Sequence, residues 1–170
     1  KSHAIVKTHE LALKGKNRPW FMRKLTDNLR TATRGSGVER VWQGQLMVGL
    51  TLEDEDCWPE VKSRLKDVFG VAKFYKAYDL PQDLDGLKAR LPELLEGRSF
   101  ESFRITTNRA DKRFPLNSEA VNREMGAFVE SLTGARVNLK NADLCIYLDI
   151  QAQGIMVYFE EVRAHGGLPV

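Results

Sequence analysis

Two short basic segments could bind a chain of phosphate groups. The first, residues 14–18, reads Lys-Gly-Lys-Asn-Arg, so it offers three cations and one amide that can donate and accept hydrogen bonds. Its glycine would allow a ligand to approach the backbone closely. The second, residues 108–115, offers the cations Arg109, Lys112 and Arg113. A predicted helix follows each segment, and a helix N-terminus also favours anions, so the pair indicates RNA bound through phosphates, stacking and amide contacts.

Each segment also has a structural interpretation. The first could equally be a solvated turn, and a basic helix face could account for the surrounding charge. In the second, we expect Phe114 to anchor the loop in the core rather than to stack on a base. Asp111 could orient Arg109, or it could cap a turn.

The sequence contains no recognisable catalytic or metal-binding constellation. Cys57 and Cys145 are expected to be packed residues, and neither has the spacing of a zinc site or of a disulfide framework. The three histidines are scattered, and no Gly-x-Ser-x-Gly nucleophile motif is present. Catalysis by this stretch alone is therefore not expected, and a reducing cytoplasm is the predicted setting.

Composition and charge are those of a folded protein with an uneven charge distribution. The chain has 170 residues, 42% of them hydrophobic, and a formal net charge of +3. Residues 1–76 carry a net charge of +6 and residues 77–170 a net charge of −3. These values exclude a disordered tail, and no apolar run approaches the roughly 20 residues of a membrane span. The basic first half favours an anionic partner.

The hydrophobic pattern of the first half predicts a ferredoxin-like domain. Short β-rich runs alternate with two amphipathic stretches in the order strand, helix, strand, strand, helix, strand. The strands are predicted at residues 3–9, 38–52 (a hairpin turning at 43–45) and 71–78, and the helices at 19–34 and 59–69. Phe69 is counted in the buried stripe of the second helix.

The second half predicts another α/β domain, which begins after a seam at residues 79–81. A leucine-rich stripe predicts a helix ending at Gly97, with Pro92 interrupting it or marking a break. Alternation predicts a strand at 100–107, and Asn117 or Ser118 can cap the next helix, which ends at Gly134. Three more strands are expected near residues 137–139, 144–151 and 155–159.

Three motifs resemble those of the tRNA 4-thiouridine synthetases, the tRNA sulfurtransferases also linked to thiamine biosynthesis. They are Glu-Leu-Ala-Leu-Lys-Gly-Lys-Asn-Arg at 10–18, Arg-x-Asp-Lys-x-Phe-Pro at 109–115, and Gly-Gly-Leu-Pro-Val at 166–170. The family usually has an Arg-Tyr-Gly-like stretch where this chain has Lys-Thr-His at 7–9. The resemblance implies an α+β protein with a ferredoxin-like domain at 1–78, a THUMP domain at 79–165, and the start of a linker to an ATP-pyrophosphatase domain at 166–170.

The resemblance also implies a function. In this family the two domains grip the acceptor stem and 3′ CCA end of tRNA, while the catalytic domain uses ATP and Mg to make 4-thiouridine at position 8. A cysteine desulfurase supplies the sulfur, the enzyme is a homodimer, and no membrane is involved. This stretch alone is expected to bind RNA without a cofactor and without making thiouridine. The residues carried over as RNA contacts are Lys14, Lys16, Asn17, Arg18, Arg109, Lys112 and Arg113.

Two alternatives remain open at this point. The chain could be the RNA-binding part of another THUMP-containing enzyme, such as a tRNA methyltransferase or deaminase. It could also be a ferredoxin-like module used for dimerisation, because that fold serves many functions.

Overall fold

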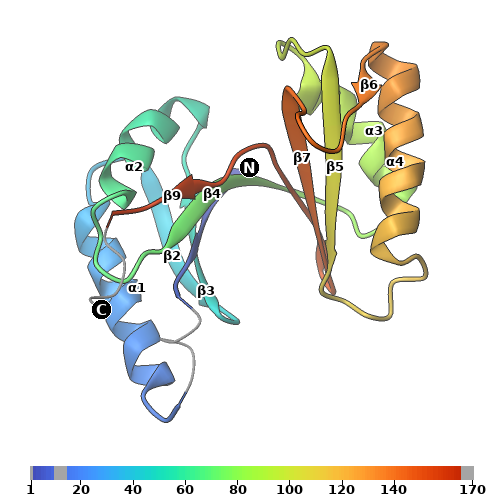
Figure 1. Cartoon of the computed structure of the whole chain (residues 1–170). Helices are drawn as coiled ribbons and strands as arrows, with labels where there is room; N and C mark the ends of the chain where they lie inside the picture. The colour runs from blue at the N-terminus through green and yellow to red at the C-terminus, as the bar shows by residue number, and fades with distance from the viewer. Residues whose placement is uncertain (1, 10–14, 166–170) are drawn as a thin grey trace. The chain divides into compact units, whose positions relative to one another are not determined.

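The computed structural model describes residues 2–9 and 15–165, and these form two compact units (Figure 1). Within the described residues, the first unit runs to Ala77 and includes the segment that starts at Glu161. The second unit is Tyr78–Glu160. Each unit has its own cluster of buried hydrophobic residues.

The first unit has the predicted ferredoxin-like order. Its elements are β1 (Ser2–Lys7), α1 (Arg18–Ala32), β2 (Val38–Gly44), β3 (Met47–Leu52), the short helix η2 (Glu55–Cys57), α2 (Trp58–Leu65) and β4 (Lys73–Leu80). The strands lie in the order β2-β3-β1-β4, and β3 is antiparallel to both β1 and β2. The turn of the hairpin falls at Gln45-Leu46, slightly later than expected, and Leu46 adopts a φ of 61° there.

Both helices of the first unit cover one face of its sheet (Figure 1). Leu25 and Leu29 of α1 and Leu65 of α2 are buried against strand residues of that face. On β2 and β3, the indole of Trp42 lies over Gly49, where an added Cβ would be 2.2 Å from Cζ2 of the ring. A glycine is therefore needed at that position.

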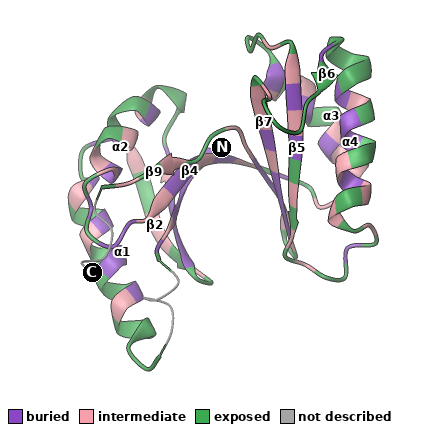
Figure 2. Cartoon of the chain, in the orientation of Figure 1, coloured by how far each residue is buried: buried purple, intermediate pink, exposed green. Residues whose placement is uncertain are grey.

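The second unit is a mixed sheet with helices packed against it. After the end of β4 come α3 (Leu84–Leu95), β5 (Ser102–Arg109), α4 (Ser118–Thr133), β6 (Arg136–Val137), β7 (Leu144–Gln151) and β8 (Gly154–Tyr158). The order runs from the end of β4 through β8, β7 and β5 to β6, and β5 is parallel to both β6 and β7. Figure 2 shows buried residues along the strands and on one side of α4. Pro92 lies inside α3, which continues to Leu95.

The segment after Glu160 returns to the first unit, whereas the family resemblance implies a THUMP domain that extends to residue 165. There β9 (Val162–Arg163) pairs antiparallel with the start of β4. The backbone N–H of Ala164 also donates to the carbonyl of Ala72 at 3.0 Å. A two-residue strand is too short to produce a readable periodicity, which is why the pattern did not reveal this return.

Candidate nucleic-acid interface

The second basic segment, residues 108–115, runs from the end of β5 into the loop before α4, and Arg109 at the strand end closes this loop. The Arg109 guanidinium donates from Nη1 to the carbonyls of Phe114 at 3.1 Å and Leu116 at 3.3 Å. The Phe114 ring is only 6% exposed and belongs to the core of the second unit. The prediction that Phe114 anchors the loop is therefore confirmed, and a buried ring cannot stack on a base.

Asp111 holds the tip of this loop. Its carboxylate accepts hydrogen bonds from Nε of Arg113 at 3.0 Å, from the Arg113 backbone N–H at 3.1 Å and from Nε2 of Gln82 at 2.6 Å. The side-chain bond from Arg113, followed by that from Gln82, lowers the pKa of Asp111 below its ordinary value of 3.8. Asp111 thus caps a turn and orients Arg113, and among the described residues no hydrogen bond joins it to Arg109.

The cations at the tip face solvent. Lys112 is exposed, and the Arg113 side chain is 81% exposed even with its bond to Asp111. Asn117 caps the following helix by accepting the Ala120 backbone N–H at 2.8 Å, while Glu119 places a negative charge in the first turn. The capping bond and this acid weaken the helix end as an anion site, so the attraction for phosphate comes mainly from the two cations.

The first basic loop is described from Gly15 onward, and the predicted contact Lys14 lies outside the described residues. Lys16, Asn17 and Arg18 are all exposed at the start of α1. Asn17 occupies the N-cap position, but its side chain makes no capping bond, and the first turn contains no acid. This helix end is therefore the more favourable of the two for an anion.

The predicted contacts thus form two groups. Arg109, Lys112 and Arg113 share one loop of the second unit, and residues 16–18 share one helix start of the first unit. Among the described residues, no cluster of three His, Cys, Asp or Glu side chains could hold a metal ion. A search of the same residues finds no helix with the length and apolarity needed to cross a membrane.

Two aromatic residues are exposed that the sequence did not identify as surface residues. Trp20 is 60% exposed on α1, and Phe69 is 54% exposed in the loop after α2. The assignment of Phe69 to a buried helical stripe was wrong because α2 ends at Leu65, so helical periodicity no longer applies at position 69. The adjacent Gly70, with a φ of 94°, was the available signal for a turn.

The ferredoxin-like unit, the mixed α/β unit and the exposed cations at two helix starts define a two-domain module suited to binding a polyanion. Residues 3–75 match the ThiI ferredoxin-like domain, and residues 81–160 match the THUMP domain. The chain therefore contains a ThiI-type ferredoxin-like domain followed by a THUMP domain. The expected fold is confirmed.

The relatives carry consistent names. The chain is 44% identical over 163 residues to a probable tRNA sulfurtransferase of Thermus thermophilus, covering 95% of this chain and 39% of the relative. It is 33% identical over 167 residues to a probable tRNA sulfurtransferase of Moorella thermoacetica, covering 98% of this chain and 42% of the relative. The chain thus spans about two fifths of the length of these curated relatives.

Solved structures share the fold. A 4-thiouridine synthetase in complex with RNA and ATP matches with a TM-score of 0.80 and 26% identity, over 99% of this chain and 43% of that one. The protein PH1313 of Pyrococcus horikoshii matches with a TM-score of 0.83 and 24% identity, over all of this chain and 57% of that one. TrmN of Thermus thermophilus matches with a TM-score of 0.60 and 17% identity, over 94% of this chain and 45% of that one. The last two likenesses show the fold alone.

Proposed function

We propose that this chain is the tRNA-binding region of a tRNA sulfurtransferase that makes 4-thiouridine at tRNA position 8. The observation that carries the proposal is the loop between β5 and α4, whose exposed cations Lys112 and Arg113 precede a helix in a THUMP domain. The names of the relatives and the RNA bound to the matching synthetase support it. The ATP-dependent chemistry belongs to the part of those relatives that this chain does not span.

The cations of the second basic loop have two roles: some contact RNA, and Arg109 supports the loop. Lys112 and Arg113 contact phosphates of the tRNA acceptor stem and 3′ CCA end, because both are exposed and neither bonds a backbone carbonyl. Arg109 and Asp111 hold the loop in shape. At the first basic loop, Lys14, Lys16, Asn17 and Arg18 supply the second set of contacts.

The proposal extends to the partners of the whole enzyme. It works as a cytoplasmic homodimer, takes sulfur from a cysteine desulfurase and uses ATP with Mg. The two domains described here position the tRNA for that reaction. They perform no chemistry themselves, and binding alone is what this chain should display.

Fluorescence anisotropy with labelled tRNA at several salt concentrations tests the binding. Each lost phosphate contact reduces the magnitude of the slope of log K against log salt by about 0.9. The double variant Lys112→Ala/Arg113→Ala should therefore reduce it by about 2. The matched control is Arg90→Ala, which removes an exposed cation paired with Glu93 on α3. A tRNA without its CCA end should bind more weakly. If the double variant binds tRNA as tightly as wild type, the loop is not part of the RNA-binding site.

A further inference from the structure

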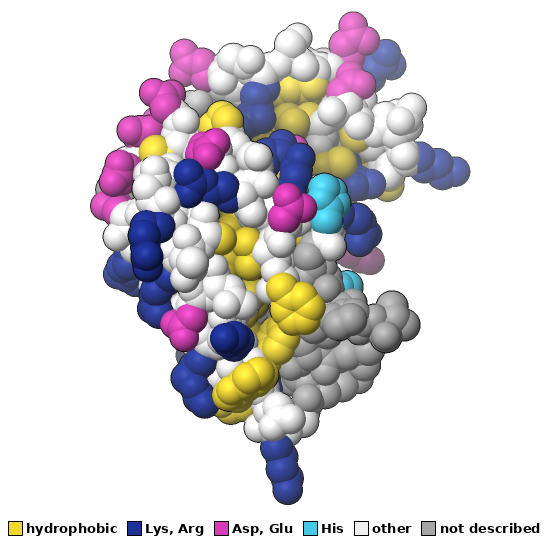
Figure 3. All heavy atoms as spheres, turned by 90° about the vertical axis from the view of Figure 1, so that its left-hand side faces the viewer, with side chains coloured by type: hydrophobic (Ala, Val, Ile, Leu, Met, Phe, Trp, Pro, Cys, Tyr) yellow, Lys and Arg dark blue, Asp and Glu magenta, His cyan; other side chains and the backbone are white. Residues whose placement is uncertain are grey.

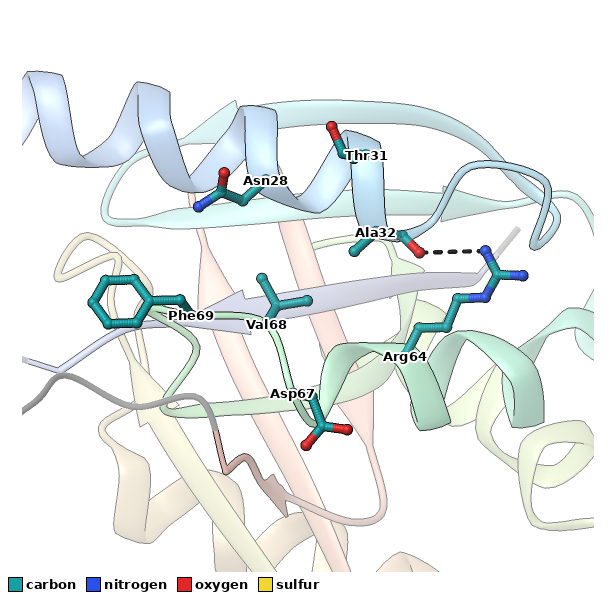
Figure 4. Close-up of a pocket in the computed structure, with 7 residues that line it drawn as sticks. All are labelled: Asn28, Thr31, Ala32, Arg64, Asp67, Val68 and Phe69. Atoms are coloured by element: carbon teal, nitrogen blue, oxygen red, sulfur yellow. Dashed lines mark hydrogen bonds between the residues drawn. The ribbon is translucent and has the colours of Figure 1, made fainter.

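A groove of about 480 Å³ lies between the two helices of the first unit. Figure 4 shows Asn28 projecting from α1, Arg64 from α2, and Phe69 from the loop that follows α2. The ring of Phe69 lies at the same end of the groove as the amide of Asn28 (Figure 4). The groove therefore combines an aromatic face with a polar side chain.

The backbone holds Phe69 at the surface. Its neighbours Val68 and Gly70 are both buried, and Gly70 turns the chain with a φ of 94°. A Cβ at Gly70 would lie 3.2 Å from Phe21 and 3.3 Å from Leu25, so this turn is packed closely against α1. Phe69 is thus exposed by a fixed turn and presents a stable aromatic surface to a partner.

Asn28 is a polar group of the groove with unused hydrogen-bonding capacity. Its side chain makes no hydrogen bond to any other described residue. Arg64, by contrast, donates to the carbonyls of Ala32 at 3.3 Å and Arg34 at 2.7 Å, and it pairs with a glutamate of its own helix. Asp67 accepts from His165 at 3.1 Å. An amide that can both donate and accept suits the edge of a nucleobase.

The charges leading to the groove favour a nucleic acid over a protein. Residues 15–28 contain four cations and one acid, Asp27, which pairs with Arg30 at 3.1 Å, and exposed Lys24 lies one turn before Asn28. Exposed Trp20 lies one further turn back, about 12 Å along the helix from Asn28. Figure 3 shows exposed hydrophobic side chains among Lys and Arg on this face. Aromatic faces within a basic track are the features that bind single strands, whereas protein interface cores are depleted of lysine.

We propose that the groove between α1 and α2 binds an unpaired nucleotide of the RNA. The base stacks on Phe69 and its edge bonds to the amide of Asn28, while Lys24 contacts the adjoining phosphate. Trp20 stacks with a second base further along the strand. This inference rests on the proposed function and adds to it a base-binding site outside both basic loops.

Phe69→Ala provides the test, with tRNA anisotropy measured over the same salt series. Loss of one stacked base should weaken binding about 5- to 150-fold. The salt slope should stay unchanged because no charge is removed. Asn28→Ala should weaken binding less, Phe69→Trp should restore it, and Leu132→Ala, at a 45% exposed residue on α4, should bind like wild type.

The outcomes separate this inference from the proposed function. Wild-type protein that fails to bind tRNA would overturn both. Wild-type protein that binds, with Phe69→Ala binding equally well, would overturn the groove and leave the basic loops as the site. The same conclusion follows if Phe69→Ala changes only self-association in sedimentation experiments. A matching urea midpoint shows that Phe69→Ala is folded.

Discussion

Replacing Arg109 tests whether this residue supports the second basic loop or contacts RNA itself. Its guanidinium bonds the carbonyls of Phe114 and Leu116, so Arg109→Ala removes both bonds at once. The loop tip then loses the link that holds the end of β5 to the residues before α4. Phe114 remains anchored by its buried ring, which should prevent complete loss of the loop.

The size of the effect follows from these two bonds. Hydrogen bonds involving a charged group contribute about 1.5–3 kcal/mol each, and partial exposure reduces that value because water can replace the lost donor. We therefore expect Arg109→Ala to lower the free energy of unfolding by about 1–3 kcal/mol. Arg113→Ala removes the same charge from an 81% exposed side chain, so its effect on stability should be about 0.5 kcal/mol or less.

Two measurements separate support from contact. Urea unfolding followed by circular dichroism gives the stability of each variant, and tRNA anisotropy at several salt concentrations gives the slope. Arg109→Ala should weaken binding with little change in slope, whereas Arg113→Ala should lower the slope by about 0.9 with little change in stability. Our reasoning is refuted if Arg109→Ala has wild-type stability and its slope of log K against log salt falls in magnitude by about 0.9.

Three further predictions use unfolding measurements. Because the pKa of Asp111 is lowered, its carboxylate stabilises the protein above about pH 4, and this contribution disappears as the pH falls through the lowered pKa. Urea midpoints of wild type and Asp111→Asn should therefore converge at acidic pH. Gly49→Ala should cost about 1–3 kcal/mol, since its Cβ would overlap Trp42. Asn117→Ala should cost about 1 kcal/mol by losing a helix cap, whereas Asn17→Ala, which loses none, should leave stability unchanged and weaken tRNA binding.

Much of the fold could be predicted from the sequence because its signals are local. Hydrophobic periodicity marked the helices, and β-rich runs bounded by glycine marked the strands. Leu25 and Leu29 in the helix predicted at 19–34, and Phe103 in the strand predicted at 100–107, are all buried. The return of Val162 and Arg163 to β4 was not predictable, because it depends on pairing with residues about 90 positions earlier.

The candidate site was less predictable because residue type does not reveal what a side chain bonds. Arg109, Lys112 and Arg113 are equivalent as cations in the sequence, yet only Arg109 bonds two carbonyls of its own loop. The spacing of Phe69 is that of a core residue in the predicted second helix. However, α2 ends at Leu65, and Phe69 lies exposed in the loop that follows. Contacts that form after the chain folds therefore decide which of several similar residues remains available to a ligand.

The two helix starts present cations in different ways. At α4, Asn117 caps the helix and Glu119 opposes an anion, so a phosphate there must be held by the loop cations that Arg109 and Asp111 position. At α1, the first turn has neither a capping side chain nor an acid, so the helix end itself adds to the attraction. The first unit should therefore attract the RNA backbone generally, whereas the braced loop of the second unit should set where the RNA is held.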